Sequence, residues 1–216
     1  MVKTPYQKVF FTPFTVSIKL LLKECWDSNL EWDEEFSKEF KSRILSFLKD
    51  VDYLKSFTLQ RWFQFDNTCS SVQLCVFGDA STSAYVACAY LYFFKFNKVH
   101  SVLLCSKSRL VKKGQHTVPR LELLAAILVT RLSVFVQAQL PSGFISKVNH
   151  FSDSSIVLNW IHGSKKALPT FVENRITEIN KKTSTKSWRH VKSLDNPADI
   201  GTRHNKSVDW LQSDLW

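Results

Sequence analysis

The chain has 216 residues, and its 44% hydrophobic content is ample for the core of a globular, soluble class of protein. The longest membrane-like stretch near the start, residues 13–22, is too short to span a bilayer and contains Lys19, so we expect neither a transmembrane helix nor a signal peptide. Five cysteines without a CxxC pair argue against a zinc site and favour a reducing compartment.

The formal net charge of +10 is unevenly distributed along the chain. Residues 1–66 hold ten Lys/Arg and ten Asp/Glu, whereas residues 67–216 hold 19 Lys/Arg and nine Asp/Glu. A basic domain favours a polyanionic partner, nucleic acid first, and the alternative is an ordinary solvated lysine-rich surface.

Residues 1–66 are predicted to form a small helical module. Apolar side chains recur at helical spacing from 14 to 26, and a second periodic segment runs from 36 to 51. The acids of the stretch EWDEE (31–35) precede the second segment, where they suit a helix N-terminus. This module contains no cluster of residues that indicates catalysis.

After a polar break at 65–71, residues 67–216 are predicted to form an α/β domain. Runs rich in β-branched and aromatic residues, separated by short turns, predict strands, and apolar residues at helical spacing predict helices. The expected order is strands at 72–78, 84–96 and 98–106, a helix at 119–139, a strand at 147–153, helices at 156–161 and 169–181, a strand at 186–193, and a last helix opened by NPADIGTR (196–203). This order predicts a mixed five-stranded sheet flanked by helices.

Glu122 is the one acid in the apolar helical stretch TVPRLELLAA (117–126). Its neighbours at helical contact distance are Val118, Pro119, Ala125 and Ala126, none of which can pair with a carboxylate. A buried acid without a partner is costly, so its partner must come from elsewhere in the fold.

Three further acids occupy informative positions in this acid-poor domain. Asp79 and Asp153 end the first and fourth predicted strands, and Asp199 lies in the first turn of the last helix. Each aspartate alone is better explained as a turn residue or helix cap, and only their combination favours a site. If the first and fourth strands are neighbours, however, Asp79, Asp153 and Glu122 converge on a site with the oxygen ligands that Mg²⁺ selects.

The chain resembles the ribonuclease H domain of BEL/Pao-type long-terminal-repeat retrotransposons over about residues 67–204. The resemblance is carried by the ordered motifs FGDAS, AYVACAYLY, LLCSKSRLV, TVPRLELLAA, FSDSSIVLNWI, FVENRITEI and WRHVKSLDNPADIGTR. The stretch FFTPFTVSIKLLLKECWDSNLEWDEEF (10–36) is also similar to the linker between reverse transcriptase and ribonuclease H in those polyproteins.

The resemblance implies a ribonuclease H-like fold and cleavage of the RNA strand of an RNA–DNA hybrid. It implies two Mg²⁺ ions, with Mn²⁺ as an alternative, held by Asp79, Glu122, Asp153 and Asp199. By analogy Asp79 would bridge both ions, Glu122 and Asp153 would bind one, and Asp199 would bind the other. The acids run Asp, Glu, Asp, Asp, as in ribonucleases H, and not Asp, Asp, Glu, as in integrases.

Two departures from the ribonuclease H pattern are visible. The loop before the last aspartate reads KSLDN (192–196) without the histidine of many cellular enzymes, and His190 on the preceding strand is interpreted as structural. The final motif reads GTRH (201–204), where the family tends towards serine-arginine-glycine. Neither departure removes a carboxylate.

No YxDD motif of a reverse transcriptase is present, so the chain is interpreted as a polyprotein fragment or a domesticated remnant. The implied partners are an RNA–DNA hybrid and the reverse transcriptase domain of the parent polyprotein, without a membrane. The implied location is the cytoplasm. The competing hypothesis is a catalytically inactive connection or nucleic-acid-binding fragment.

Candidate substrate contacts lie close to the acids in sequence. Lys107, Arg109 and Arg120 are predicted to contact phosphates, because an A-like hybrid is held by its backbone. Their alternative role is that of solvated surface charges. Ser81 and Ser154, each just after an aspartate, are expected to orient a carboxylate or to touch a 2′-hydroxyl.

Overall fold

The computed structural model describes residues 11–28, 31, 33–55, 69–112, 114, 117–163 and 167–203. The predicted boundary between residues 66 and 67 lies outside these ranges and stays a prediction. The helices are α1 (Thr12–Asp27), α2 (Lys38–Lys55), α3 (Val118–Gln139), α4 (Ser155–Gly163), α5 (Thr170–Lys182) and α6 (Ala198–Thr202), and the strands are β1 (Cys69–Ala80), β2 (Ala84–Lys95), β3 (Lys98–Leu110), β4 (Lys147–Ser152) and β5 (Trp188–His190).

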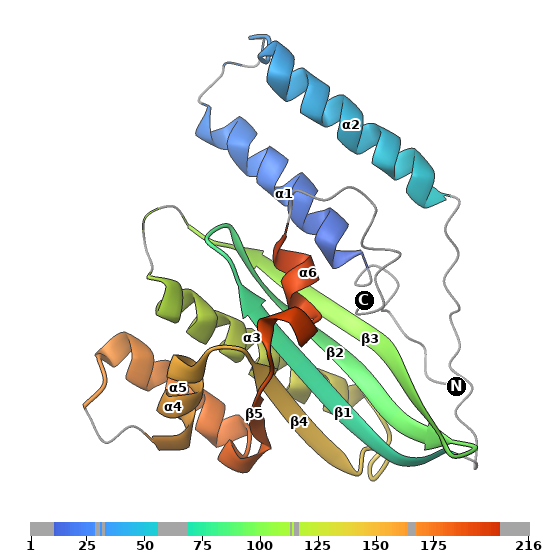
Figure 1. Ribbon diagram of the computed structural model, residues 1–216. Helices are drawn as coiled ribbons and strands as arrows, with labels where there is room; N and C mark the ends of the chain where they lie inside the picture. Colours follow the sequence, from blue (N-terminus) through green and yellow to red (C-terminus); the bar gives the residue numbers. More distant parts are fainter. Residues whose placement is uncertain are drawn as a thin grey trace.

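The five strands form one mixed sheet in the order β3-β2-β1-β4-β5 (Figure 1). Strands β1, β2 and β3 pair antiparallel, whereas β4 pairs parallel with both β1 and β5. The predicted α/β class and the mixed five-stranded sheet are therefore confirmed. The fifth strand is shorter than the predicted 186–193, because single 3₁₀ turns at Thr185–Ser187 and Ser193–Asp195 leave only three residues to pair with β4.

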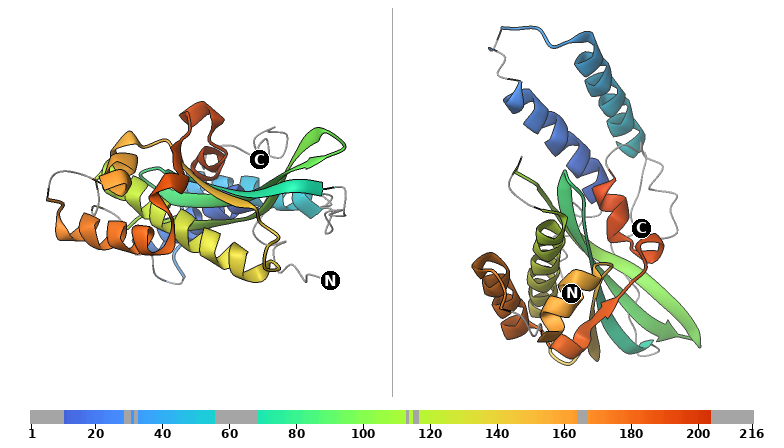
Figure 2. Two further views of the ribbon diagram at one scale, coloured as in Figure 1. Left: turned by 90° about the horizontal axis from the view of Figure 1, so that it is seen from below. Right: turned by 60° about the vertical axis from the view of Figure 1, so that its left-hand side comes forward.

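Helix α3 covers one face of the sheet and forms the centre of the core. It packs on β1 and β2, with α4 and α5 on the same side (Figure 2). Gly78 allows this close approach, since a Cβ atom there would lie 2.5 Å from Cγ2 of Val129. By length and composition α3 could cross a membrane, but 61% of its most apolar window is buried inside the protein, as in a core helix.

The opposite face of the sheet carries α6 and α1. Val16 of α1 is fully buried against Ala84 and Val86 of β2. The hydroxyl of Ser106 on β3 donates to Thr12 Oγ1 at 2.7 Å, which adds a buried polar contact to this interface. The first helix of the predicted module is therefore docked on the sheet.

Helix α2 is attached to α1 rather than to the sheet. The rings of Phe14 and Phe47 stack with centroids 4.4 Å apart. Arg43 forms a bidentate pair with Glu24 at 2.7 and 2.8 Å. Figure 1 shows the two helices side by side, with α2 farther from the sheet than α1.

Candidate active site

Two strands bring Asp79 and Asp153 to the same edge of the sheet. Gly78 on β1 pairs in parallel with Ser152 on β4. Asp79 is the residue after Gly78, and Asp153 is the residue after Ser152. The first and fourth strands are therefore adjacent, which is the condition for the acids to converge. The convergence follows from the parallel pairing, because the carboxyl ends of parallel strands lie at one edge of the sheet.

Asp79 is half-buried and lies within electrostatic reach of two other acids. Its pKa is raised from 3.8 to about 6, mainly by burial and also by the charges of Asp153 and Asp199. The Thr202 hydroxyl, which donates to Oδ2 of Asp79 at 2.5 Å, acts in the opposite direction. Three of the four predicted acids thus form one electrostatically coupled group.

Glu122 finds its partner on a different element. The hydroxyl of Ser154 donates to Oε2 of Glu122 at 2.5 Å. Ser154 is itself buried, and its hydroxyl also accepts from the Val157 amide at 3.3 Å, at the start of α4. The packing of α3 against α4 therefore explains the lone acid of α3, and it ties Glu122 to the residue that follows Asp153.

Asp153 and Asp199 are held by residues of β5 and of the segment that follows it. Ser193 donates to Oδ2 of Asp153 at 2.8 Å, and Nε2 of His190 lies 3.1 Å from the Asp153 carbonyl oxygen. Arg203 forms an ion pair with Asp199. Sequence reasoning missed these partners. Arg203 could have been found, because it lies four residues after Asp199, where helical side chains meet.

Asn196 connects the start of α6 to β1 at the residue before Asp79. Its side-chain amide donates to the carbonyl oxygen of Gly78 at 3.1 Å, and its Oδ1 accepts from the Ala198 amide at 3.2 Å. Asn196 is 1% exposed, so these hydrogen bonds satisfy a buried polar side chain. Gly201 then lets α6 approach β2, since a Cβ atom there would lie 2.8 Å from Cγ1 of Val86.

The donor set suits a hard divalent cation, which selects carboxylate oxygens. Within the ranges that the structure describes, no three His, Cys, Asp or Glu side chains lie close enough together to hold a metal ion. Each of the four acids is instead engaged by a hydroxyl or a guanidinium group of the chain. The carboxylate chemistry of the site suits Mg²⁺, and each carboxylate has a donor of the chain beside it that would orient it.

The predicted substrate contacts lie on several elements. Lys107 and Arg109 are exposed on β3, and Arg120 lies two residues before Glu122 with its guanidinium 5.1 Å from the centroid of the Phe171 ring. Ser81 serves the turn between β1 and β2, where its hydroxyl accepts from the Ala84 amide at 3.1 Å. Contacts of these residues with a substrate stay predictions.

Solved structures, among them two ribonucleases H and a viral reverse transcriptase, align with the chain at low identity. The N-terminal RNase H domain of Rv2228c from Mycobacterium tuberculosis, solved as a fusion with maltose-binding protein, aligns at 15% identity over 61% of this chain and 94% of that chain, with a TM-score of 0.41. LC11-RNase H1 in complex with an RNA/DNA hybrid aligns at 17% identity over 66% and 99%, with a TM-score of 0.41. A foamy viral protease-reverse transcriptase in complex with double-stranded DNA aligns at 12% identity over 81% of this chain but 28% of that chain, with a TM-score of 0.47.

Sequence comparison identifies the family. None of the curated proteins matches the chain significantly. The family described as Pao retrotransposon-like RNaseH-like domain matches residues 7–154, which is more than half of the chain and includes Asp79, Glu122 and Asp153. The match also includes α1, which lies in the stretch 10–36 that resembles the linker of those polyproteins, and α2. The chain therefore belongs to the Pao retrotransposon-like RNaseH-like domain family.

Proposed function

We propose that the chain hydrolyses the RNA strand of RNA–DNA hybrids during reverse transcription of a retrotransposon. The observation that carries this proposal is the coupled group of Asp79 and Asp153, at the ends of two parallel strands, and Asp199 of α6, in a domain otherwise short of acids. Membership of a family with a ribonuclease H-like domain supports it.

The proposed cofactors are two Mg²⁺ ions, with Mn²⁺ as an alternative, held by Asp79, Glu122, Asp153 and Asp199. Bound metal ions of this kind activate a water molecule and stabilise the leaving oxygen of a phosphodiester. The chain orients the carboxylates with neighbouring donors, which are Thr202 for Asp79, Ser154 for Glu122, Ser193 for Asp153 and Arg203 for Asp199. Donors next to metal-binding carboxylates fix the direction of the ligand oxygens.

The proposed substrate is held through its backbone. Lys107, Arg109 and Arg120 supply positive charge around the site, and an A-like hybrid presents phosphates and 2′-hydroxyls rather than base edges. The second proposed partner is the reverse transcriptase domain of the same polyprotein, and the proposed location is the cytoplasm.

A second function, binding of nucleic acid without catalysis, is favoured by one observation. Among the described residues no three potential ligands are already gathered around a common point. A connection module that retained the fold and the basic surface would have this property without cutting its ligand.

Cleavage of an end-labelled RNA–DNA hybrid by the purified chain separates the two functions. The proposal predicts cutting of the RNA strand with Mg²⁺, no cutting with EDTA, and no cutting of double-stranded or single-stranded RNA. A folded protein that binds the hybrid but does not cut it in Mg²⁺ or Mn²⁺ would support the binding module instead.

A further inference from the structure

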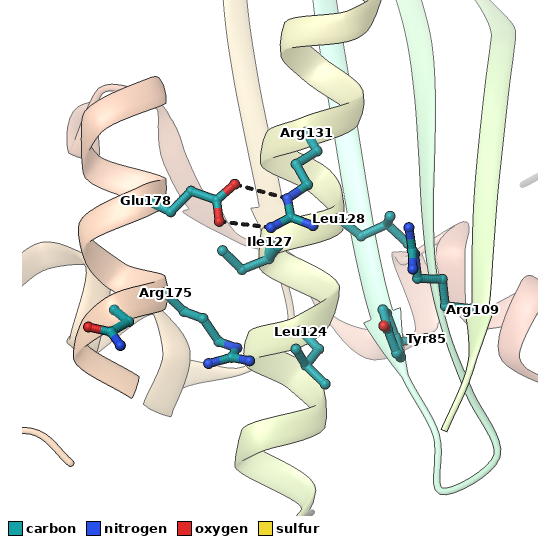
Figure 3. A pocket seen from close by; sticks show the side chains of 9 residues that line it. Tyr85, Arg109, Leu124, Ile127, Leu128, Arg131, Arg175 and Glu178 are labelled. Atoms are coloured by element: carbon teal, nitrogen blue, oxygen red, sulfur yellow. Dashed lines mark hydrogen bonds and ion pairs between the residues drawn. The ribbon is translucent and has the colours of Figure 1, made fainter. Parts of the chain in front are cut away.

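A cavity of about 260 Å³ lies between α3, α5 and the strands β2 and β3 (Figure 3). Its charged lining comprises three arginines and one glutamate, so the lining carries a formal surplus of two positive charges. The lining residues are Tyr85, Arg109, Leu124, Ile127, Leu128, Arg131, Asn174, Arg175 and Glu178. Leu124 and Glu122 are two residues apart on α3, and therefore about 200° apart around the helix, so the cavity faces a different side of α3 from the acid.

The only acid of the lining is already neutralised. Glu178 accepts two hydrogen bonds from Arg131, both at 2.9 Å, and one from Lys182 at 2.7 Å. The hydrogen bond from Arg131 and then that from Lys182 lower the pKa of Glu178 to about 2. In the part of the chain that the structure describes, Arg109 and Arg175 form no ion pair. The positive charge of the cavity is therefore not balanced from within the described protein.

Arg175 is held in place for a ligand by the protein itself. Its Nη1 donates to the Phe171 carbonyl oxygen at 2.8 Å, and its guanidinium group lies 3.4 Å from the centroid of the Phe171 ring. A guanidinium group has five N–H donors, so most of them stay available. Figure 3 shows Arg175 reaching from α5 towards α3, with Arg109 and Tyr85 on the strands beyond α3.

We propose that this cavity binds a phosphate group of a nucleic acid outside the catalytic cleft. Planar guanidinium groups bind phosphate oxygens through paired charge-assisted hydrogen bonds, and Tyr85 and Asn174 add neutral donors. The apolar side chains of Leu124 and Ile127 offer a surface for the adjoining sugar. A free nucleotide carries the same phosphate group, so the choice of a nucleic acid as its source rests on the proposed function.

The cavity lies within reach of a nucleic acid that occupies the active site. Arg131 is nine residues beyond Glu122, which corresponds to about 14 Å along a helix that rises about 1.5 Å per residue. Along the axis of a duplex the phosphates of one strand are spaced at about 3.4 Å, so the cavity is a few nucleotides away. A long hybrid or a strand that flanks it would place a phosphate there, and a short hybrid confined to the cleft would not.

Binding assays without catalysis test this inference. Fluorescence anisotropy in EDTA would compare a short and a long RNA–DNA hybrid on the wild type, Arg109→Ala, Arg175→Gln and Lys181→Ala. Lys181 is the matched control, since it is an exposed cation on α5 that does not line the cavity. Adenosine monophosphate, titrated on the same four proteins, tests a free nucleotide as the source.

Loss of one charge-assisted contact is expected to weaken binding of the long hybrid about tenfold for Arg109→Ala and Arg175→Gln. It is also expected to reduce the slope of log affinity against log salt by about one. The short hybrid on Arg175→Gln, and both hybrids on Lys181→Ala, are expected to show no comparable loss. Arg109→Ala is expected to weaken both hybrids, because Arg109 is also a proposed substrate contact. Asn174→Ala keeps the test valid if Arg175→Gln does not fold, because Asn174 lines the cavity, is exposed and is not a proposed contact of the cleft.

Equal behaviour of the three variants on the long hybrid and on the nucleotide would overturn the inference. A nucleotide that binds the wild type and not Arg175→Gln, with hybrids indifferent to both substitutions, would assign the phosphate site to a free nucleotide. Failure of the proposed function is distinguishable, since it would appear as absent cleavage in Mg²⁺ while the binding differences in EDTA remain.

Discussion

The contact between Gly78 and Val129 yields a quantitative prediction about the junction of β1 and α3. In Gly78→Ala the new Cβ atom would lie 2.5 Å from Cγ2 of Val129, about an ångström inside ordinary van der Waals contact, while the nearest backbone atom, the Ala125 oxygen, would be at 3.4 Å. Overpacking of a core typically costs about 1–3 kcal/mol. The ordinary advantage of alanine over glycine within a strand, about 0.5–1 kcal/mol, offsets only part of this. We therefore expect Gly78→Ala to lower the free energy of unfolding by about 1–2 kcal/mol.

The double variant Gly78→Ala/Val129→Ala identifies the cause. Removing the Val129 methyl groups leaves a cavity, which the new methyl at position 78 would partly fill. Urea unfolding of the wild type, both single variants and the double variant, with unchanged m-values, gives the coupling energy. We expect the double variant to be more stable than the sum of the single effects by about 1 kcal/mol or more. Additive effects would refute the account of how α3 approaches β1.

Three further predictions concern buried polar groups. The ring nitrogens of His150 lie 2.8 and 2.9 Å from serine hydroxyls, and burial lowers its pKa from 6.5 to about 4. Between pH 4 and 6.5 the folded state binds fewer protons than the unfolded state, so the free energy of unfolding should fall by up to about 3 kcal/mol as the pH drops from 6.5 towards 4. Urea unfolding should show a smaller dependence of this free energy on pH for His150→Gln than for the wild type. Among the described residues, Thr130 Oγ1 is a buried oxygen without a hydrogen-bond partner. Thr130→Val should therefore increase the free energy of unfolding by about 1 kcal/mol and raise the melting temperature. Ser154→Ala removes the donor to Glu122 and should slow hybrid cleavage about 10–100-fold with hybrid binding retained, whereas Ser154→Thr, which keeps the hydroxyl, should lose less.

Much of the fold was predictable because its signals are local. Alternating and continuous apolar runs indicated all five strands, and the order of the elements indicated a mixed sheet. The placement of Asp79 and Asp153 together required only that β1 and β4 be neighbours, which the structure shows. The short β5 was mispredicted because its length is set by pairing with β4 and not by its own residues.

The support around the acids could not be predicted, because it depends on contacts between distant elements. The sequence excluded a local partner for Glu122, but Ser154 is 32 residues away and meets it only through the packing of α3 against α4. Asn196 likewise reaches Gly78 across 118 residues. The arginine-lined cavity is a third case, since its lining comes from β2, β3, α3 and α5.

Single-turnover cleavage of an RNA–DNA hybrid by Asp153→Asn, against Asp195→Asn as the matched control, tests the central claim most directly. Asp195 is an exposed acid close to the site in sequence, and it is not among the four proposed ligands. We predict that Asp153→Asn abolishes cleavage in Mg²⁺ while binding the hybrid in Ca²⁺ as tightly as the wild type, and that Asp195→Asn still cuts. Unchanged cleavage by Asp153→Asn would contradict the assignment of the four acids as the site of hydrolysis.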